Sequence, residues 1–93
     1  LFWQKKEQQI FVEENFFSLA KEMASGKGET LETFASLLGC SPESHGEFGT
    51  FTKHHYGTLF QNEKTTAIEL IDAVQKEIPK DEKLSASCTS IQI

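Results

Sequence analysis

The sequence predicts an all-α fold: a small bundle of about four helices with an irregular C-terminal tail. Two observations predict it. Apolar residues recur at helical spacing through most of the chain. Glycine or proline stands at intervals where one helix would end and the next would begin. The 93 residues, 38% of them hydrophobic, suit one domain, so we expect a single all-helical domain over residues 1–93, with 80–93 as its tail.

Charge and the distribution of apolar residues argue against a nucleic-acid partner and against a membrane span. The formal net charge is −5, and the nine basic residues are scattered lysines with no arginine among them. Nucleic-acid binders usually present a basic stripe with arginine forks, so we expect no nucleic-acid partner. A membrane span needs about 20 consecutive apolar residues, and the sequence contains no such run.

The first predicted helix runs from Phe2 to Ala24, a stretch without glycine or proline. Gly26 is placed to be the left-handed residue after its last turn. One apolar stripe contains Val12, Phe16, Leu19, Ala20 and Met23, and a second contains Trp3, Ile10 and Phe17. The other predicted helices do not account for Leu1, Phe2 and Trp3. We therefore interpret these three residues as an interaction surface that faces a protein partner, a second copy of the chain or a preceding segment of a longer chain.

The second predicted helix is short and bounded by glycines, from Glu29 to the residue before Gly39. Leu31, Phe34, Ala35 and Leu38 recur at i, i+3, i+4 and i+7, which places them on one stripe. Glu29, Glu32, Thr33 and Ser36 are left toward water. We therefore expect this helix to be the central wedge on which the others pack.

Two further helices are predicted after Cys40. Ser41 and Pro42 are suited to the N-cap and the first helical position of a third helix that reaches about Phe60. Its glycines, Gly46, Gly49 and Gly57, weaken it but allow a close approach to a neighbouring helix. Asn62 is the expected cap of a fourth helix, stopped by Pro79, whose apolar face holds Ala67, Ile68, Leu70, Ile71, Val74 and Ile78. A short helical turn near 81–84 and a last stretch of open conformation complete the prediction.

The residues able to carry chemistry are few and poorly spaced. Cys40 and Cys88 allow either one disulfide or two free buried thiols. The candidate metal ligands are Cys40, His45, His54 and His55. Their spacing argues against a site, because it lacks the i, i+3 or i, i+4 pairs of helical metal sites. His55 lies on the apolar stripe of its helix, and His54 is expected in solvent. A nucleophilic Cys40 would lie just before the start of the third predicted helix. The sequence offers no evident carboxylate to orient a histidine base and no evident oxyanion donors.

Three other patterns have simpler structural interpretations. The glutamates form a solvated face without an apolar setting for general-acid chemistry. Residues 25–28, Ser-Gly-Lys-Gly, lack the spacing of a phosphate-binding loop and indicate a turn between helices. The aromatic residues form a core, with a ligand cavity as the less favoured alternative.

A set of residues resembles a known bacterial family, domain of unknown function 3015. The residues that carry the resemblance are Asn15, Leu19, Ala24, Gly26, Gly28, Glu29, Leu31, Ala35, Leu37, Leu38, Gly39, Cys40, Phe48, Gly49, Tyr56 and Phe60. The likeness covers about 11–60, corresponds to the C-terminal half of family members, and does not extend past Pro79. It implies a secreted protein of the periplasm or cell envelope with no assigned activity, and it makes a Cys40–Cys88 disulfide more plausible.

The sequence therefore predicts a non-catalytic interaction or structural domain of a bacterial envelope protein, the C-terminal part of a longer secreted chain. We expect no enzyme activity and no cofactor. The alternative is a small-ligand or metal-binding domain that uses the aromatic core or the histidines and Cys40.

Overall fold

A computed structural model describes the backbone of residues 2–88 and the side chains from Lys6 to Cys88. Within this range the chain is α-helical, and Cys40 and Cys88 form its single isolated β-bridge. The elements are α1 (Phe2–Glu14), α2 (Phe16–Ser25), α3 (Glu29–Leu37), the 3₁₀ turn η1 (Pro42–Ser44), α4 (His45–His54), α5 (Tyr56–Leu59), α6 (Ala67–Glu77), the 3₁₀ turn η2 (Ile78–Lys80) and α7 (Glu82–Ser87).

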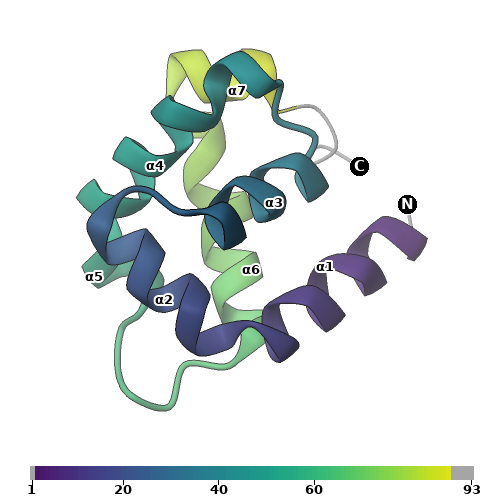
Figure 1. The fold of residues 1–93 in the computed structure, drawn as a ribbon, viewed down its shortest axis with the longest axis vertical. Helices are drawn as coiled ribbons and strands as arrows, with labels where there is room; N and C mark the ends of the chain where they lie inside the picture. The colour runs from purple at the N-terminus through teal and green to yellow at the C-terminus, as the bar shows by residue number, and fades with distance from the viewer. Residues whose placement is uncertain (1, 89–93) are drawn as a thin grey trace.

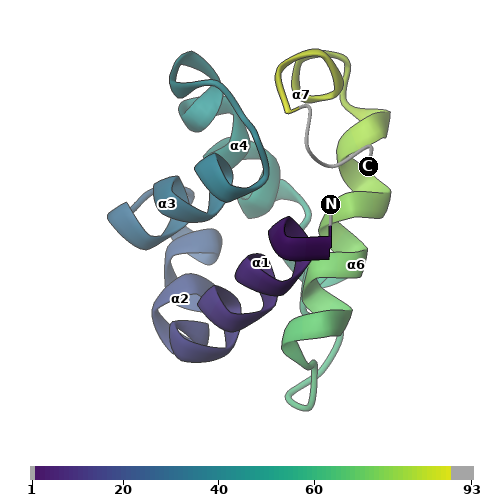
Figure 2. The same ribbon diagram turned by 90° about the vertical axis from the view of Figure 1, so that its right-hand side faces the viewer.

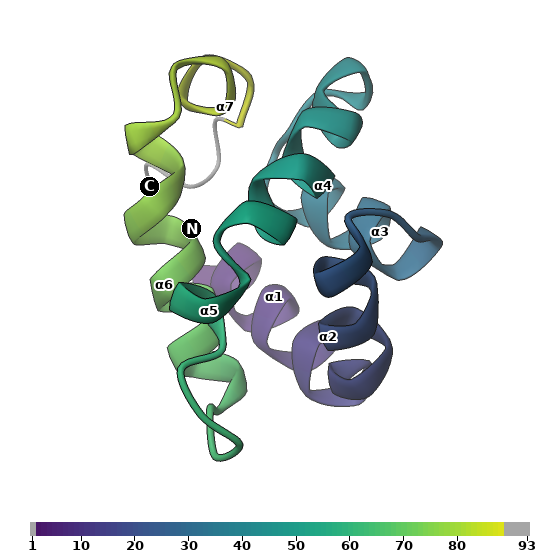
Figure 3. The same cartoon turned by 90° about the vertical axis from the view of Figure 1, so that its left-hand side faces the viewer.

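The all-α prediction is confirmed, but the expected number of about four helices is wrong. The described residues form seven α-helices, because two predicted long helices are broken and a separate short one follows η2. In Figure 1, α6 stands upright while α1 and α2 lie across its lower half. Figures 2 and 3 show α6 and α7 on one side, α2 and α3 on the other, and α1 and α4 between them.

The predicted first helix breaks at Asn15, which separates α1 from α2. Asn15 leaves helical geometry with φ −122° and ψ 24°, and its side-chain amide donates to the carbonyl of Phe11 at 2.9 Å. Asparagine competes for backbone groups in this way and is a weak helix former. A straight helix over 2–24 would be about 34 Å long, whereas the longest dimension of the molecule is 31 Å. The bend allows both halves to pack on one core.

The predicted wedge helix is confirmed as α3. Its four stripe residues, Leu31, Phe34, Ala35 and Leu38, are buried, and the four residues expected in water are exposed. Gly26, with φ 87°, ends α2 as predicted by donating its N–H to the carbonyl of Glu22. Gly28 has no side chain with which to cap α3, and a carboxylate oxygen of Glu22 accepts the Leu31 N–H instead, at 2.9 Å. A residue of α2 therefore caps α3.

The predicted third helix is interrupted. Pro42 opens a 3₁₀ turn rather than an α-helix, and the Ser41 side chain caps no backbone N–H. A second break lies at His55, where φ is −101° and ψ is 16°. Phe51 before this break and Leu59 after it are both buried in the core.

One glycine of α4 makes the close approach expected of this segment. A Cβ placed on Gly49 would overlap the carbonyl oxygen of Gly26, the residue after α2, whereas a Cβ on Gly46 or Gly57 would meet nothing within 4 Å. The buried hydroxyl of Thr52 donates to the Gly49 carbonyl at 2.9 Å, and it lies 3.4 Å from the carbonyl oxygen of Met23. We call this contact between α2 and α4 the glycine seam, formed by Met23, Gly26, Gly49 and Thr52.

The start of α6 corrects another prediction. Thr66, not Asn62, is the N-cap, and it forms a capping box with Glu69. The Asn62 side chain instead accepts the Lys64 N–H within the preceding loop. Ile68, expected on the apolar face, is 51% exposed. The helix ends at Glu77, immediately before the turn that contains Pro79.

The helical turn predicted near 81–84 is a longer helix, α7, capped by the carboxylate of Asp81. The expected irregular tail from residue 80 is therefore wrong as far as Cys88, because Leu84 and Cys88 are buried and hold this segment in the core. The last predicted stretch, 89–93, lies outside the described residues. Every α-helix contributes to one buried core. Its members include Val12, Leu19, Met23, Leu31, Phe34, Leu38, Phe48, Phe51, Leu59, Leu70, Ile71, Val74, Ile78 and Leu84.

Candidate functional site

The structure joins the two cysteines. Cys40 and Cys88 form a disulfide, and both residues are buried. Beside it, the Ser41 N–H donates to the carbonyl of Ser87 at 3.1 Å. The bridge therefore ties the segment after α3 to the end of α7. With its sulfur in a disulfide, Cys40 has no thiol to act as a nucleophile in this state.

The three histidines have different surroundings. His45 is half-buried, with Nε2 3.5 Å from the Ser36 hydroxyl oxygen. His54 is exposed, as expected, and the His55 ring lies against Phe51 with 4.8 Å between ring centroids. Within 2–88 no three His, Cys, Asp or Glu side chains are placed to hold a metal ion together. The candidate set of Cys40 and the histidines is thus not brought together.

The aromatic residues pack on one another. Phe34 lies edge-on to Phe48 with centroids 6.1 Å apart, and Phe48 stacks on Phe51 at 6.0 Å. Phe11, at the edge of this group, stacks on Phe34 at 6.4 Å. These rings fill the centre of the molecule as core material.

The predicted interaction surface of Leu1, Phe2 and Trp3 is not tested. Leu1 lies outside the described residues, and so do the side chains of Phe2 and Trp3. The other two members of the Trp3 stripe are described, and both are exposed: Ile10 to 45% and Phe17 to 91%. The stripe therefore faces outward over its described part.

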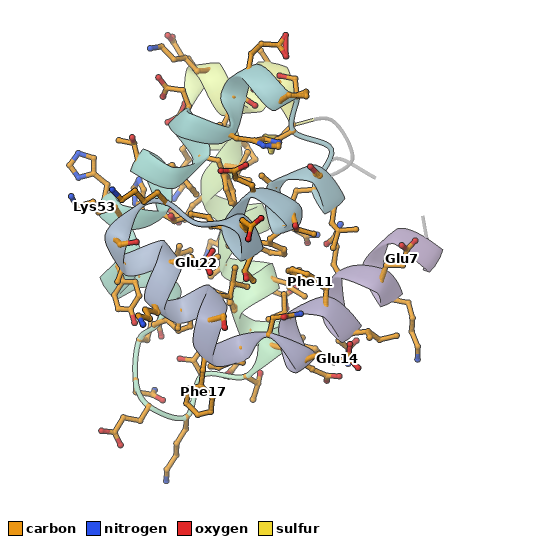
Figure 4. All side chains as sticks on the ribbon, viewed as in Figure 1. Glu7, Phe11, Glu14, Phe17, Glu22 and Lys53 are labelled. Carbon is orange, nitrogen blue, oxygen red and sulfur yellow. A yellow bond between two sulfur atoms is a disulfide. The ribbon has the colours of Figure 1, made fainter. Side chains whose placement is uncertain are left out.

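Phe17 is the most exposed large apolar side chain that the structure describes. In Figure 4 it points away from the other helices, at the start of α2. Its neighbour Phe16 turns inward and packs edge-on to Phe60, with 5.7 Å between ring centroids. Sequence reasoning placed Phe17 on an apolar stripe but did not name it as a site. The signal is that Phe17 lies about 100° around the helix from Phe16, on a different stripe from Val12, Phe16 and Leu19.

An open groove of about 330 Å³ lies between α1 and α3. It is lined by Glu7, Ile10, Phe11, Glu14, Thr33 and Leu37. Figure 4 shows Phe11 between the two helices, with Glu7 and Glu14 on either side of it along α1. This groove and Phe17 are two features of the described surface that favour contact with another molecule.

Fold and surface together define a class: an all-helical domain closed by one disulfide, with apolar side chains left in solvent. The chain belongs to the protein family of unknown function DUF3015, whose model matches residues 1–88. The match is longer than the 11–60 expected, and it includes Cys88, so the expectation that the family likeness ends before Pro79 is wrong. No curated protein and no solved structure matches the chain.

The search for a membrane span gives a negative result over the described part of the chain. None of the helices there is both long and apolar enough to cross a bilayer.

Proposed function

We propose that this chain is a non-catalytic interaction domain of a secreted bacterial protein, located in the periplasm or cell envelope, and that its outward apolar residues contact another protein. The observation that carries the proposal is the 91% exposure of Phe17. The other described phenylalanines are buried or half-buried. A chain this small needs its large apolar residues for its core, so a phenylalanine left in water calls for another use.

Aromatic side chains are the residues most often found at the energetic centre of protein interfaces. They bury a large area while losing little conformational entropy. Phe17 lies at the corner where α1 meets α2, and Ile10 lies on the outward face of α1. A partner that covers both would remove two apolar side chains from water without repacking the core.

The disulfide supports the proposed compartment. Structural disulfides persist in oxidising surroundings such as the periplasm and are rare in the reducing cytosol. Both cysteines of the Cys40–Cys88 bridge are buried, which makes the bridge part of the packed structure rather than an exposed pair.

The proposed absence of catalysis rests on how the polar residues are used. Cys40 is in the disulfide, His55 packs on Phe51, and the half-buried Glu22 caps α3. Catalytic groups need to converge on one substrate position, and these side chains have separate structural roles.

Photocrosslinking from position 17 tests the proposed function. A photoreactive phenylalanine analogue replaces Phe17 in the full-length protein in its native host, and a control carries the analogue at the exposed Lys64 in the loop before α6. We expect a discrete covalent adduct from position 17 and none from position 64. The adduct mass separates a different protein from a second copy of the chain. The absence of an adduct from position 17 would contradict the proposal.

A further inference from the structure

The groove between α1 and α3 combines an apolar floor with acidic ends. Ile10, Phe11 and Leu37 supply apolar side chains. Glu7 and Glu14 are seven residues apart on α1, which puts them on the same face two turns apart, about 10.5 Å along the axis. Both carboxylates are exposed, so they flank the apolar strip without entering the core.

Among the described residues that line the groove, two are glutamates and none is basic. The opposite wall, α3, contains no basic residue. The two ion pairs found in the described part of the molecule, Lys80–Glu77 and Lys83–Glu47, involve neither α1 nor α3. Lys6 lies one turn before Ile10 on α1, but neither of those two ion pairs joins it to Glu7 or Glu14. An occupant of the groove therefore meets two carboxylates that form no ion pair in the described part of the molecule.

We infer that this groove binds a cationic amphipathic helix: a partner segment with apolar side chains on one face and lysine or arginine beside them. The inference rests on the proposed function and specifies the chemistry of its partner. Two helices flanking a groove accept a third helix whose apolar ridge fits between them. The carboxylates of Glu7 and Glu14 select positive charge on the flanks of that ridge and speed its association.

A second copy of the chain fits this groove poorly. Each copy carries a net charge of −5. The described side chains of α1 include three glutamates and one lysine, so two copies that meet at this face would bring like charges together. A cationic segment from another protein meets no such repulsion.

The groove is only two helical turns long, so the binding is expected to be weak and dependent on salt. A fluorescent Leu/Lys peptide of about 18 residues, long enough to form a helix, serves as the probe. A Leu/Glu peptide with the same pattern tests the charge. A peptide of the same Leu/Lys composition in scrambled order tests amphipathicity. Fluorescence anisotropy gives the affinities, and amide chemical shifts locate the site.

Matched variants of the protein separate groove binding from general attraction to an acidic protein. We expect Glu7→Gln/Glu14→Gln to weaken binding of the Leu/Lys peptide by about tenfold. Glu63→Gln/Glu82→Gln changes the net charge equally at exposed positions outside the groove, and its effect is expected to be less than about twofold. Ile10→Glu is expected to abolish binding, and Ile68→Glu, at a similarly exposed isoleucine of α6, is expected to preserve it. Thermal unfolding of each variant verifies that it folds.

Three outcomes would overturn the inference. The first is equal weakening by the two glutamate pairs. The second is equal binding of the scrambled peptide, or shift changes that map away from α1 and α3. The third is a dimer of the chain that buries Ile10. The crosslinking test at position 17 does not depend on these outcomes. An adduct from position 17 without peptide binding keeps the proposed function and rejects only the groove as the binding site. Peptide binding without an adduct rejects Phe17 as a contact residue.

Discussion

Two parts of the molecule, α4 and the α1–α2 corner, use similar apolar content in opposite ways. In α4 the apolar side chains of Phe48 and Phe51 face inward, and the exposed positions hold polar groups such as Thr50 and Lys53. At the α1–α2 corner, Val12 and Leu19 are buried, but Ile10 and Phe17 remain in water. The difference is that α4 buries the large apolar side chains it carries, whereas the corner leaves two of them in solvent.

The close packing around α4 depends on two devices that the corner lacks. The glycine seam brings α2 and α4 into backbone contact, and the disulfide ties α7 to the segment that leads into α4. The Lys83 ammonium, on α7, also donates to the Glu47 carboxylate of α4 at 3.2 Å. Changes on the α4 side should therefore cost stability, while outward changes at the corner should not.

Removing the disulfide is the largest expected effect. Cys40→Ala/Cys88→Ala should lower the free energy of unfolding by about 4 kcal/mol, because a bridge across 48 residues restricts the unfolded chain. Urea denaturation followed by circular dichroism measures the change, with the wild-type protein in a reducing agent as a second comparison. An unchanged midpoint in both would show that the bridge does not support the fold.

Gly49→Ala is expected to cause the next largest loss of stability. The new methyl group would overlap the Gly26 carbonyl, so α2 and α4 must separate, at a cost of about 3 kcal/mol. Gly46→Ala, in the same helix but with open space around it, should stabilise the protein by about 0.5–1 kcal/mol. Thermal melts of the two variants give the comparison. Equal effects would mean that the seam is looser than the structure has it.

The Phe16–Phe17 pair tests the corner directly. Phe16→Ala should cost about 2 kcal/mol, because it removes the half-buried ring that packs on Phe60. Phe17→Ala should change stability by less than about 0.5 kcal/mol, since its ring is in solvent. Urea unfolding of both variants checks the difference. A comparable loss from Phe17→Ala would place that ring in the core.

The cap that α2 provides for α3 is the smallest expected effect. Glu22→Ala removes the acceptor of the Leu31 N–H and should cost about 1 kcal/mol. Glu32→Ala, at an exposed position of α3, is the control and should have almost no effect. Hydrogen exchange of the first amides of α3 reports the loss locally. Unchanged exchange there would show that the carboxylate is not needed as a cap.

The sequence predicts the parts of this fold that depend on local signals. Gly26 and Gly39 have left-handed φ values and lie just after α2 and α3, as expected. The broken helices depend on distant contacts instead. Asn15 is only a weak local signal, and the bend there follows from the need to pack both α1 and α2 on one core. The capping of α3 by Glu22 joins two helices, so no pattern within either helix contains it.

The candidate site is less predictable than the fold for the same reason. Helical periodicity groups Trp3, Ile10 and Phe17 on one stripe but does not say whether a neighbour covers it. Gln8 is the opposite case, a polar residue that is only 2% exposed. Its burial is tolerated because its side-chain amide donates to the Leu37 carbonyl and its side-chain oxygen accepts from Gln75. Its partners come from α3 and α6, which only the folded structure brings together.

The solvent exposure of residue 17 in the isolated protein is the most direct test of the corner as a functional surface. A variant with Trp3→Phe and Phe17→Trp carries a single tryptophan at that position. We expect its fluorescence to resemble that of free tryptophan in water and to be quenched readily by acrylamide. Blue-shifted emission that resists the quencher would show that residue 17 is already buried, leaving no open aromatic surface for a partner.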